Sequence, residues 1–196
     1  MNYDVPLISE PGTEYHYSGV GYFLLSQIIE EVSGQQYHRF LRENIFDPLD
    51  MASTGSDRQE QIIRDRASGY EMVDGAVINA APIYMQILTG GGDIYSTVED
   101  MRHWHDGLTG KKLLSEESYA QMFTPGLNNY GYGWQIQLRN GLTMAMHTGG
   151  MPGFRSLFMT FPELDSCIII LSNNSSTNMQ DILDYVVGVV LDSSPH

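Results

Sequence analysis

Basic residues are scarce in this chain. Its 196 residues include 10 lysines and arginines against 24 aspartates and glutamates, which gives a formal net charge of −14 at pH 7. A nucleic-acid-binding protein needs a basic surface that displaces counterions from phosphates, so we expect no nucleic-acid partner. An anionic membrane surface repels such a chain for the same reason. The excess of carboxylates is typical of a well-solvated surface.

Cysteine and long apolar runs are also lacking. Cys167 is the single cysteine, so an internal disulfide is excluded. Its place in an apolar run indicates a buried strand position rather than a reactive thiol. No run approaches the ~18 apolar residues of a membrane-spanning helix. The first ten residues carry neither the basic nor the apolar part of a signal peptide. We expect no membrane span, and the sequence leaves the cellular location open.

Helical periodicity begins near the start of the chain. Ser18 is a suitable N-cap, and Gly34 is a suitable end, for a helix whose apolar residues recur at helical spacing: Tyr22, Leu25, Ile28, Ile29 and Val32. A second helix is predicted over residues 36–46, ending before Pro48.

The middle of the chain combines loops with two further helices. The segment 69–80 resembles a hairpin that turns at Asp74-Gly75. A glycine-rich loop then leads into a helix for which Ser96 and Glu99 form a capping box. A short helix is predicted after Ser115, ending near Thr124.

The period changes after residue 125. Four strand-like runs are separated by turn signals at Asn140-Gly141, at 149–153 and at 162–165, and a helix closes the chain; the runs are residues 130–138, 142–148, 154–161 and 166–173, and the helix is 178–192. The predicted fold class is α+β. We divide the chain into a mostly helical region, 1–125, and an antiparallel region, 126–196, within one shared fold.

Several candidate sites have simpler explanations. Gly90-Gly91-Gly92 precedes a helix, but no Gly-Lys-Ser/Thr follows and Asp93 would repel a phosphate, so a tight turn is the better interpretation. His103 and His105 are spaced so that they face different sides of a helix, which makes them a poor metal pair and favours solvated or partly packed histidines. No Gly-x-Ser-x-Gly elbow occurs. We expect neither a metal nor a cofactor.

The segment "MHTGGMPGF", residues 146–154, is more unusual. His147 ends an apolar run and is followed by small residues whose backbone N–H groups stay accessible. That arrangement suits the wall beside a reacting carbonyl, with an amide ready for an oxyanion. The alternative is a histidine at a strand end followed by a glycine-rich hairpin turn.

Five segments together resemble the serine β-lactamase-like family, which holds class C β-lactamases, penicillin-binding proteins, DD-peptidases, D-aminopeptidases and related carboxylesterases. They occur in the family's order and cover nearly the whole chain: "PGTEYHYSGVGYFLLSQIIEEVSG", "YHRFLRENIFDPLDM", "GGGDIYSTVEDM", "YGYGW" and "HTGGMPGFRS". The resemblance implies a β-lactamase/transpeptidase-like fold and acyl transfer through a serine ester. In this family a Ser-x-x-Lys motif supplies the nucleophilic serine and a lysine. A Tyr-Ser/Ala-Asn motif supplies the tyrosine that shuttles the proton, and a Lys/His-x-Gly motif borders the oxyanion site.

The resemblance assigns roles to two short segments. Tyr17 matches the tyrosine, which needs cationic neighbours to act as a base, and Ser18 matches the middle position of its motif. His147 is one candidate neighbour. The third motif falls on His147, Thr148 and Gly149, and the N–H of Gly150 would form half of the oxyanion hole.

Two departures from the family pattern matter. Gly19 stands where the pattern has an asparagine, so the amide that grips substrate is absent. Ser-x-x-Lys cannot occur, because Lys111 and Lys112 are the only lysines and neither follows a serine at that spacing. Thr109 precedes Lys112 at the right spacing, but it falls after the Tyr-Ser motif, whereas the family's nucleophile precedes it. The nucleophile is therefore unknown.

Three hypotheses follow. The chain is part of a serine hydrolase that acts on a β-lactam, a D-amino-acid peptide or an ester, with the histidine favouring peptidase or esterase relatives. Alternatively, it is a non-catalytic module that holds a peptide-like or acyl ligand. In the third hypothesis it is an inactive fragment whose exposed sheet edge pairs with a second copy as a homodimer.

Overall fold

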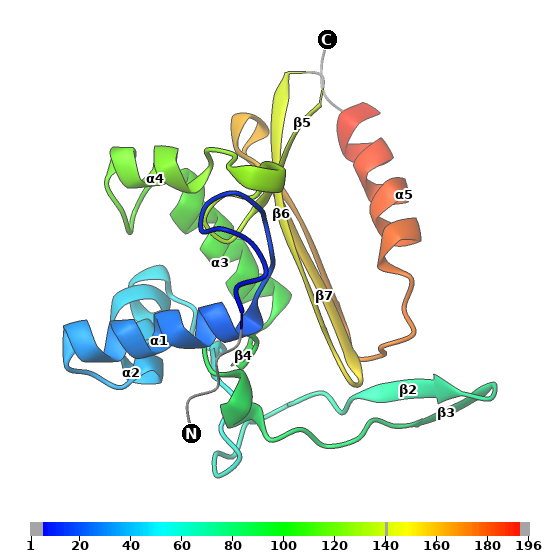
Figure 1. The fold of residues 1–196 in the computed structure, drawn as a ribbon. Helices are drawn as coiled ribbons and strands as arrows, with labels where there is room; N and C mark the ends of the chain where they lie inside the picture. The colour runs from blue at the N-terminus through cyan, green and yellow to red at the C-terminus, as the bar shows by residue number, and fades with distance from the viewer. Residues whose placement is uncertain (1–5, 140, 193–196) are drawn as a thin grey trace.

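The computed structural model describes residues 6–139 and 141–192. A four-stranded antiparallel sheet forms its centre, in the order β5-β6-β7-β8, with bounds Gln135–Arg139, Leu142–Met151, Phe154–Phe161 and Ser166–Ser172. The registers pair Gln135 with Met146 and His147 with Phe158. Helix α5, Met179–Asp192, lies along one face, and helices α3, Val98–Thr109, and α4, Glu116–Met122, lie on the other (Figure 1). The fold is α+β, as predicted.

The two faces of the sheet have separate cores because side chains alternate along each strand. In β7, Leu157, Met159 and Phe161 join α5 in one cluster with Met144, Ile168, Leu183 and Val187. Phe158 points the other way and joins a second cluster with Leu108, Tyr119, Trp134, Ile136 and Ala145. The second cluster combines α3 and α4 with the sheet, so the sheet end and the helices are held in one packed unit.

The remaining elements are α1, Gly19–Ser33; α2, Tyr37–Leu41; the short pair β1, Gly55–Ser56, with β4, Ile94–Tyr95; and the hairpin β2, Tyr70–Val73, with β3, Ala76–Asn79. In Figure 1 helices α1 and α2 lie to the left of the lower half of the sheet, and the hairpin of β2 and β3 lies at its lower end. The hairpin turns at Asp74 and Gly75, both at positive φ, as the sequence predicted. A third core cluster, Leu41, Phe46, Leu49 and Met51, supports α2.

Helix α1 buries little of its apolar surface. Ser26 is its buried residue, and Tyr22 and Ile29 are half-buried. Most of the apolar residues that predicted the helix lie exposed instead, together with their neighbours: Val20, Leu24, Leu25, Ile28 and Val32. Tertiary packing therefore contributes less to α1 than to the helices that cover the sheet.

Several predicted boundaries are wrong. The second helix does not end before Pro48. Helix α2 continues as a π-helix, Arg42–Phe46, and then as a 3-10 helix, Asp47–Leu49. Pro48 is tolerated because it lies in the first turn of the 3-10 helix, where a backbone N–H would have no partner within the helix. The N-cap of α3 is Thr97 rather than Ser96, and its hydroxyl accepts from the N–H of Asp100 at 3.2 Å. The hydroxyl of Ser96 instead contacts that of Thr54 at 2.8 Å.

Two strand boundaries also differ from prediction. Strand β5 begins at Gln135 rather than at residue 130, because Gly133 takes a φ of 83° and turns the chain. Strand β6 extends through Met151, so Gly149 and Gly150 lie in the strand and not in a turn. The predicted Asn140-Gly141 turn includes Asn140, which is outside the described residues.

Candidate active site

The start of α1 presents Tyr17 beside strand β6. Ser18 caps the helix, with extended dihedrals and a side-chain oxygen that accepts from the N–H of Gly21 at 3.1 Å. The cap fixes where the helix begins, and Tyr17 is the residue directly before it. The Tyr17 side chain is 53% exposed.

The glycine-rich loop holds this end of α1 in place. A Cβ at Gly90 would lie 2.7 Å from the carbonyl oxygen of Tyr22 and 2.8 Å from the Cβ of Ser26, and one at Gly91 would lie 3.2 Å from the oxygen of Gly19. The loop closes on itself, since the N–H of Gly90 donates to the carboxylate of Asp93 at 3.0 Å. The predicted tight turn is confirmed, and its glycines permit close packing against the helix.

His147 lies where β6 leaves its partner β5. Pairing between these strands ends at Met146, so in the described part of the chain residues 147–151 have a strand partner, β7, on one side alone. Thr148, Gly149 and Gly150 are exposed on this segment. A Cβ at Gly149 would meet the hydroxyl of Ser156 on β7, which would have to rotate away.

The fold brings Tyr17 and His147 together although 130 positions separate them. Their ring centroids are 5.9 Å apart. Tyr22 lies 5.8 Å and Tyr130 6.2 Å from the Tyr17 ring, again between centroids. The two sequence motifs that the family resemblance singled out therefore form one aromatic cluster.

Hydrogen bonds connect this cluster in a line. The hydroxyls of Tyr22 and Tyr130 are 2.7 Å apart, and the Tyr130 hydroxyl is 2.9 Å from Nε2 of His147. Nδ1 of His147 is 2.8 Å from the carbonyl oxygen of Thr148. Sequence reasoning did not assign a role to Tyr22 or Tyr130. The "YGYGW" segment carries Tyr130, but nothing in its spacing indicates a partner in α1.

The pKa values of two phenols in this cluster are raised. Burial raises the pKa of Tyr17 above its usual value, and the hydroxyls of Tyr22 and Tyr15 raise it further. Burial and the hydrogen bond with Tyr22 raise the pKa of Tyr130 more strongly. Both shifts favour the protonated, neutral form of these two phenols.

The histidines of α3 have structural surroundings. His103 Nδ1 lies 3.0 Å from the carbonyl oxygen of Asp50. His105 is buried, more fully than predicted, with Nδ1 3.2 Å from the Thr160 hydroxyl and Nε2 3.5 Å from a carboxylate oxygen of Asp165. Within 6–139 and 141–192, no group of three or more His, Cys, Asp and Glu side chains could hold a metal ion.

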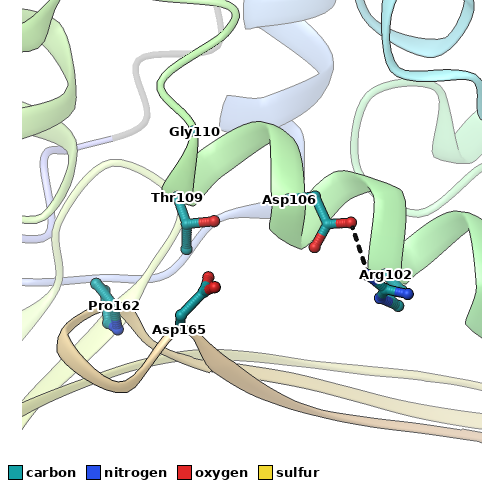
Figure 2. Close-up of a pocket in the computed structure, with 6 residues that line it drawn as sticks. All are labelled: Arg102, Asp106, Thr109, Gly110, Pro162 and Asp165. Carbon is teal, nitrogen blue, oxygen red and sulfur yellow. Dashed lines mark hydrogen bonds and ion pairs between the residues drawn. The ribbon is translucent and has the colours of Figure 1, made fainter.

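A separate hollow lies between α3 and the turn from β7 to β8. Figure 2 shows its lining, and its volume is about 500 Å³; the residues are Arg102, Asp106, Thr109, Gly110, Pro162 and Asp165. Arg102 and Asp106 are already paired at 3.3 Å. None of the residues of the aromatic cluster lines this hollow.

Two further predictions concern Cys167 and membranes. Cys167 lies in strand β8 but is half-buried rather than fully buried, and burial raises the pKa of its thiol. A raised thiol pKa disfavours the reactive thiolate. Of the helices in the described residues, none has the length and apolar character needed to cross a membrane.

Comparison with known proteins identifies the relatives of the chain. A family model described as Beta-lactamase matches residues 3–190. PbpX of Bacillus subtilis, which bears the name of a penicillin-binding protein, is 32% identical over 170 residues, which are 86% of this chain and 42% of the relative. The chain thus spans less than half the length of this relative.

Solved structures give the same result. The octameric penicillin-binding protein homologue from Pyrococcus abyssi is 26% identical with a TM-score of 0.85, over 96% of this chain and 45% of that one. D-amino acid amidase from Ochrobactrum anthropi is 25% identical with a TM-score of 0.81, over 94% and 59%. From its family match, its fold and these relatives, the chain belongs to the beta-lactamase family and is related to its serine hydrolases.

Proposed function

We propose that the chain carries the tyrosine-histidine half of an acyl-serine hydrolase site and, taken alone, holds an acyl ligand without turning it over. The observation that carries this proposal is the meeting of Tyr17 and His147, 5.9 Å apart, beside a strand segment that is paired on one side. In the complete reaction a serine oxygen bonds to the substrate carbonyl carbon, the leaving group departs with a proton, and water then releases the acyl group.

Within this site, each residue has a distinct proposed role. Tyr17 carries the proton that passes between serine and leaving group, and Ser18 fixes the position of Tyr17 by capping α1. Thr148 and Gly149 lie along the ligand, and the N–H of Gly150 stabilises the oxyanion. His147 borders this segment.

The nucleophile is the missing part of the proposal. Thr109 does not serve, since its hydroxyl donates to the carbonyl oxygen of His105 at 3.2 Å within α3. Lys111 forms an ion pair with Glu116 at 3.1 Å.

The substrate class is proposed from the relatives. The amidase from Ochrobactrum anthropi acts, by its name, on D-amino acid amides. We propose the same broad class for this site: a D-amino-acid peptide or amide, with esters and β-lactams as the other members of the acyl class. The histidine in the third motif favours the peptide or ester.

Ligand binding can be tested by NMR. An acyl-D-Ala-D-Ala peptide is titrated into the ¹⁵N-labelled chain, with the L,L isomer as control. We expect saturable amide shifts at Thr148, Gly149 and Gly150 with the D,D peptide and weaker ones with the L,L peptide. Shifts elsewhere, or none at millimolar peptide, would reject the proposed ligand site.

A homodimer through the sheet edge is a second proposal. Strand β8 pairs with β7 on one side, and in the described part of the chain no strand pairs along its other side. An open edge presents unpaired N–H and C=O groups to a second chain. The Pyrococcus abyssi relative is octameric by its title. Size-exclusion chromatography with light scattering tests this, and a monomer at high concentration would contradict it.

A further inference from the structure

A line of hydrogen bonds runs from α1 through Tyr130 to the strand segment of the candidate site. Tyr22 belongs to α1, Tyr130 precedes β5, and His147 belongs to β6. The three side chains are linked at 2.7 Å and 2.9 Å, and both distances are those of well-formed hydrogen bonds. Three separate elements therefore meet through side chains that the proposed reaction does not use as nucleophile, base or oxyanion donor.

The carbonyl oxygen of Thr148 determines the donor and the acceptor of each hydrogen bond in this line. The carbonyl oxygen of Thr148 accepts only, so Nδ1 of His147 must carry the proton across the 2.8 Å contact. In a neutral imidazole Nε2 is then an acceptor, and the Tyr130 hydroxyl must donate to it. The Tyr130 oxygen is left to accept, and Tyr22 becomes its donor.

We propose that Tyr130, supported by Tyr22, is a positioning residue that holds His147 as the neutral, Nδ1-protonated tautomer and thereby fixes the segment Thr148–Gly150 relative to α1. Nδ1 is tied to the backbone of Thr148, and Nε2 is tied to Tyr130. The imidazole ring consequently has both nitrogens occupied within the protein. His147 acts as an anchor for the strand segment rather than as a cation beside Tyr17.

The surroundings of Tyr130 favour this arrangement. Its ring packs against Tyr15 with centroids 5.2 Å apart and meets His147 edge-on at 6.1 Å. The raised pKa of its hydroxyl keeps the donor proton present over the physiological range. Among the described residues, Tyr17 and Tyr130 are in ring contact with His147, and Tyr22 lies one hydrogen bond further away.

The tautomer of His147 is directly measurable. Long-range ¹H–¹⁵N correlation spectra at pH 8, where an ordinary imidazole is neutral, distinguish the protonated from the bare ring nitrogen. We expect Nδ1 to be protonated and Nε2 bare in the unaltered chain. In Tyr130→Phe the preference for this tautomer should fall roughly 3- to 10-fold, the worth of one hydrogen bond. Tyr22→Phe should weaken it in the same direction by less.

Tyr132→Phe is the matched control. Tyr132 lies two positions from Tyr130 but is 73% exposed, so its hydroxyl should not affect the His147 spectrum. A protonated Nε2 or an even mixture in the unaltered chain would overturn the proposal, whether or not any variant folds. An unchanged His147 spectrum in a folded Tyr130→Phe would also overturn it.

The functional part of the inference rests on the proposed ligand site, whereas the tautomer does not. If ligand binds, Tyr130→Phe should weaken the peptide-induced shifts at Thr148–Gly150 several-fold, with Tyr132→Phe unchanged. Equal binding by both variants would overturn the positioning role. If no peptide binds but the tautomer is as expected, the proposed ligand site is rejected, whereas the proposed role of Tyr130 in selecting the His147 tautomer is retained.

Discussion

Replacing Gly90 with alanine tests whether the glycine-rich loop holds α1 in place. Gly90 has a φ of 76°, where a Cβ costs about 1–2 kcal/mol. The added Cβ would also lie 2.7 Å from the Tyr22 carbonyl oxygen and 2.8 Å from the Ser26 Cβ, where backbone and helix must shift. Overpacking of this kind costs about 1–3 kcal/mol. We therefore expect Gly90→Ala to lower the free energy of unfolding by about 2–5 kcal/mol.

Gly75→Ala separates the two contributions. Gly75 has a φ of 80°, nearly that of Gly90, but no atom lies within 4 Å of its added Cβ. Its substitution should cost the backbone part alone, about 1–2 kcal/mol. The difference between the variants then measures the steric contact of the loop with α1.

Urea unfolding followed by far-ultraviolet circular dichroism gives both values. Thermal midpoints should differ by about 2–4 °C for each kcal/mol between the two variants. Equal destabilisation by Gly90→Ala and Gly75→Ala would refute the reasoning, because it would mean that the loop does not press on α1 as closely as the structure has it.

Substitutions at three further positions have defined outcomes. Ser18→Ala should lower stability by about 1 kcal/mol and Ser18→Gly by a few tenths, since the cap bond to the Gly21 N–H is lost; equal losses in urea titrations would contradict this. Tyr17→Phe should leave stability nearly unchanged, because in the described residues its exposed hydroxyl has no recorded hydrogen bond; a loss well above 2 kcal/mol would indicate buried packing instead. Burial and Asp93 raise the pKa of Tyr37 to about 12. The protonated Tyr37 phenol stabilises the folded chain below pH 10, and this contribution is lost as the pH rises from 10 to 12. Over that range the free energy of unfolding of the unaltered chain should fall by about 2 kcal/mol more than that of Tyr37→Phe. Parallel pH profiles of the two proteins would contradict this prediction.

Local features of the fold could be predicted from the sequence. Ser18 caps α1, Asp74-Gly75 turns the hairpin, and Gly90 lies in a tight turn, because each depends on the residue's own dihedrals or on a neighbour a few positions away. The alternation of β7 likewise follows from its own side chains, with Leu157 and Phe158 on opposite faces.

Features decided by distant contacts could not be predicted. Ser96 and Thr97 are both good capping residues, and the contact of Ser96 with Thr54 leaves Thr97 to cap α3. The line from Tyr22 through Tyr130 to His147 depends on three elements meeting, which no local pattern encodes. The burial of His105 likewise depends on a distant residue, Thr160, and could not be predicted from local sequence.

The candidate site could be predicted in part. The family resemblance singled out Tyr17 and His147, and the fold brings them together. Resemblance suggested His147 as a cationic neighbour of Tyr17. In the structure both ring nitrogens of His147 have partners within the protein, at Thr148 and Tyr130, and burial with the neighbouring Tyr22 and Tyr15 raises the pKa of Tyr17.

We propose that this chain carries the tyrosine-histidine half of the site without a nucleophile. Intact-mass spectrometry after incubation with a fluorophosphonate probe for active serines tests it most directly, on protein shown by circular dichroism to be folded and with a serine hydrolase as positive control. We predict an unchanged mass. A stoichiometric adduct that peptide mapping assigns to one serine would contradict the account, because the chain would then possess its own nucleophile.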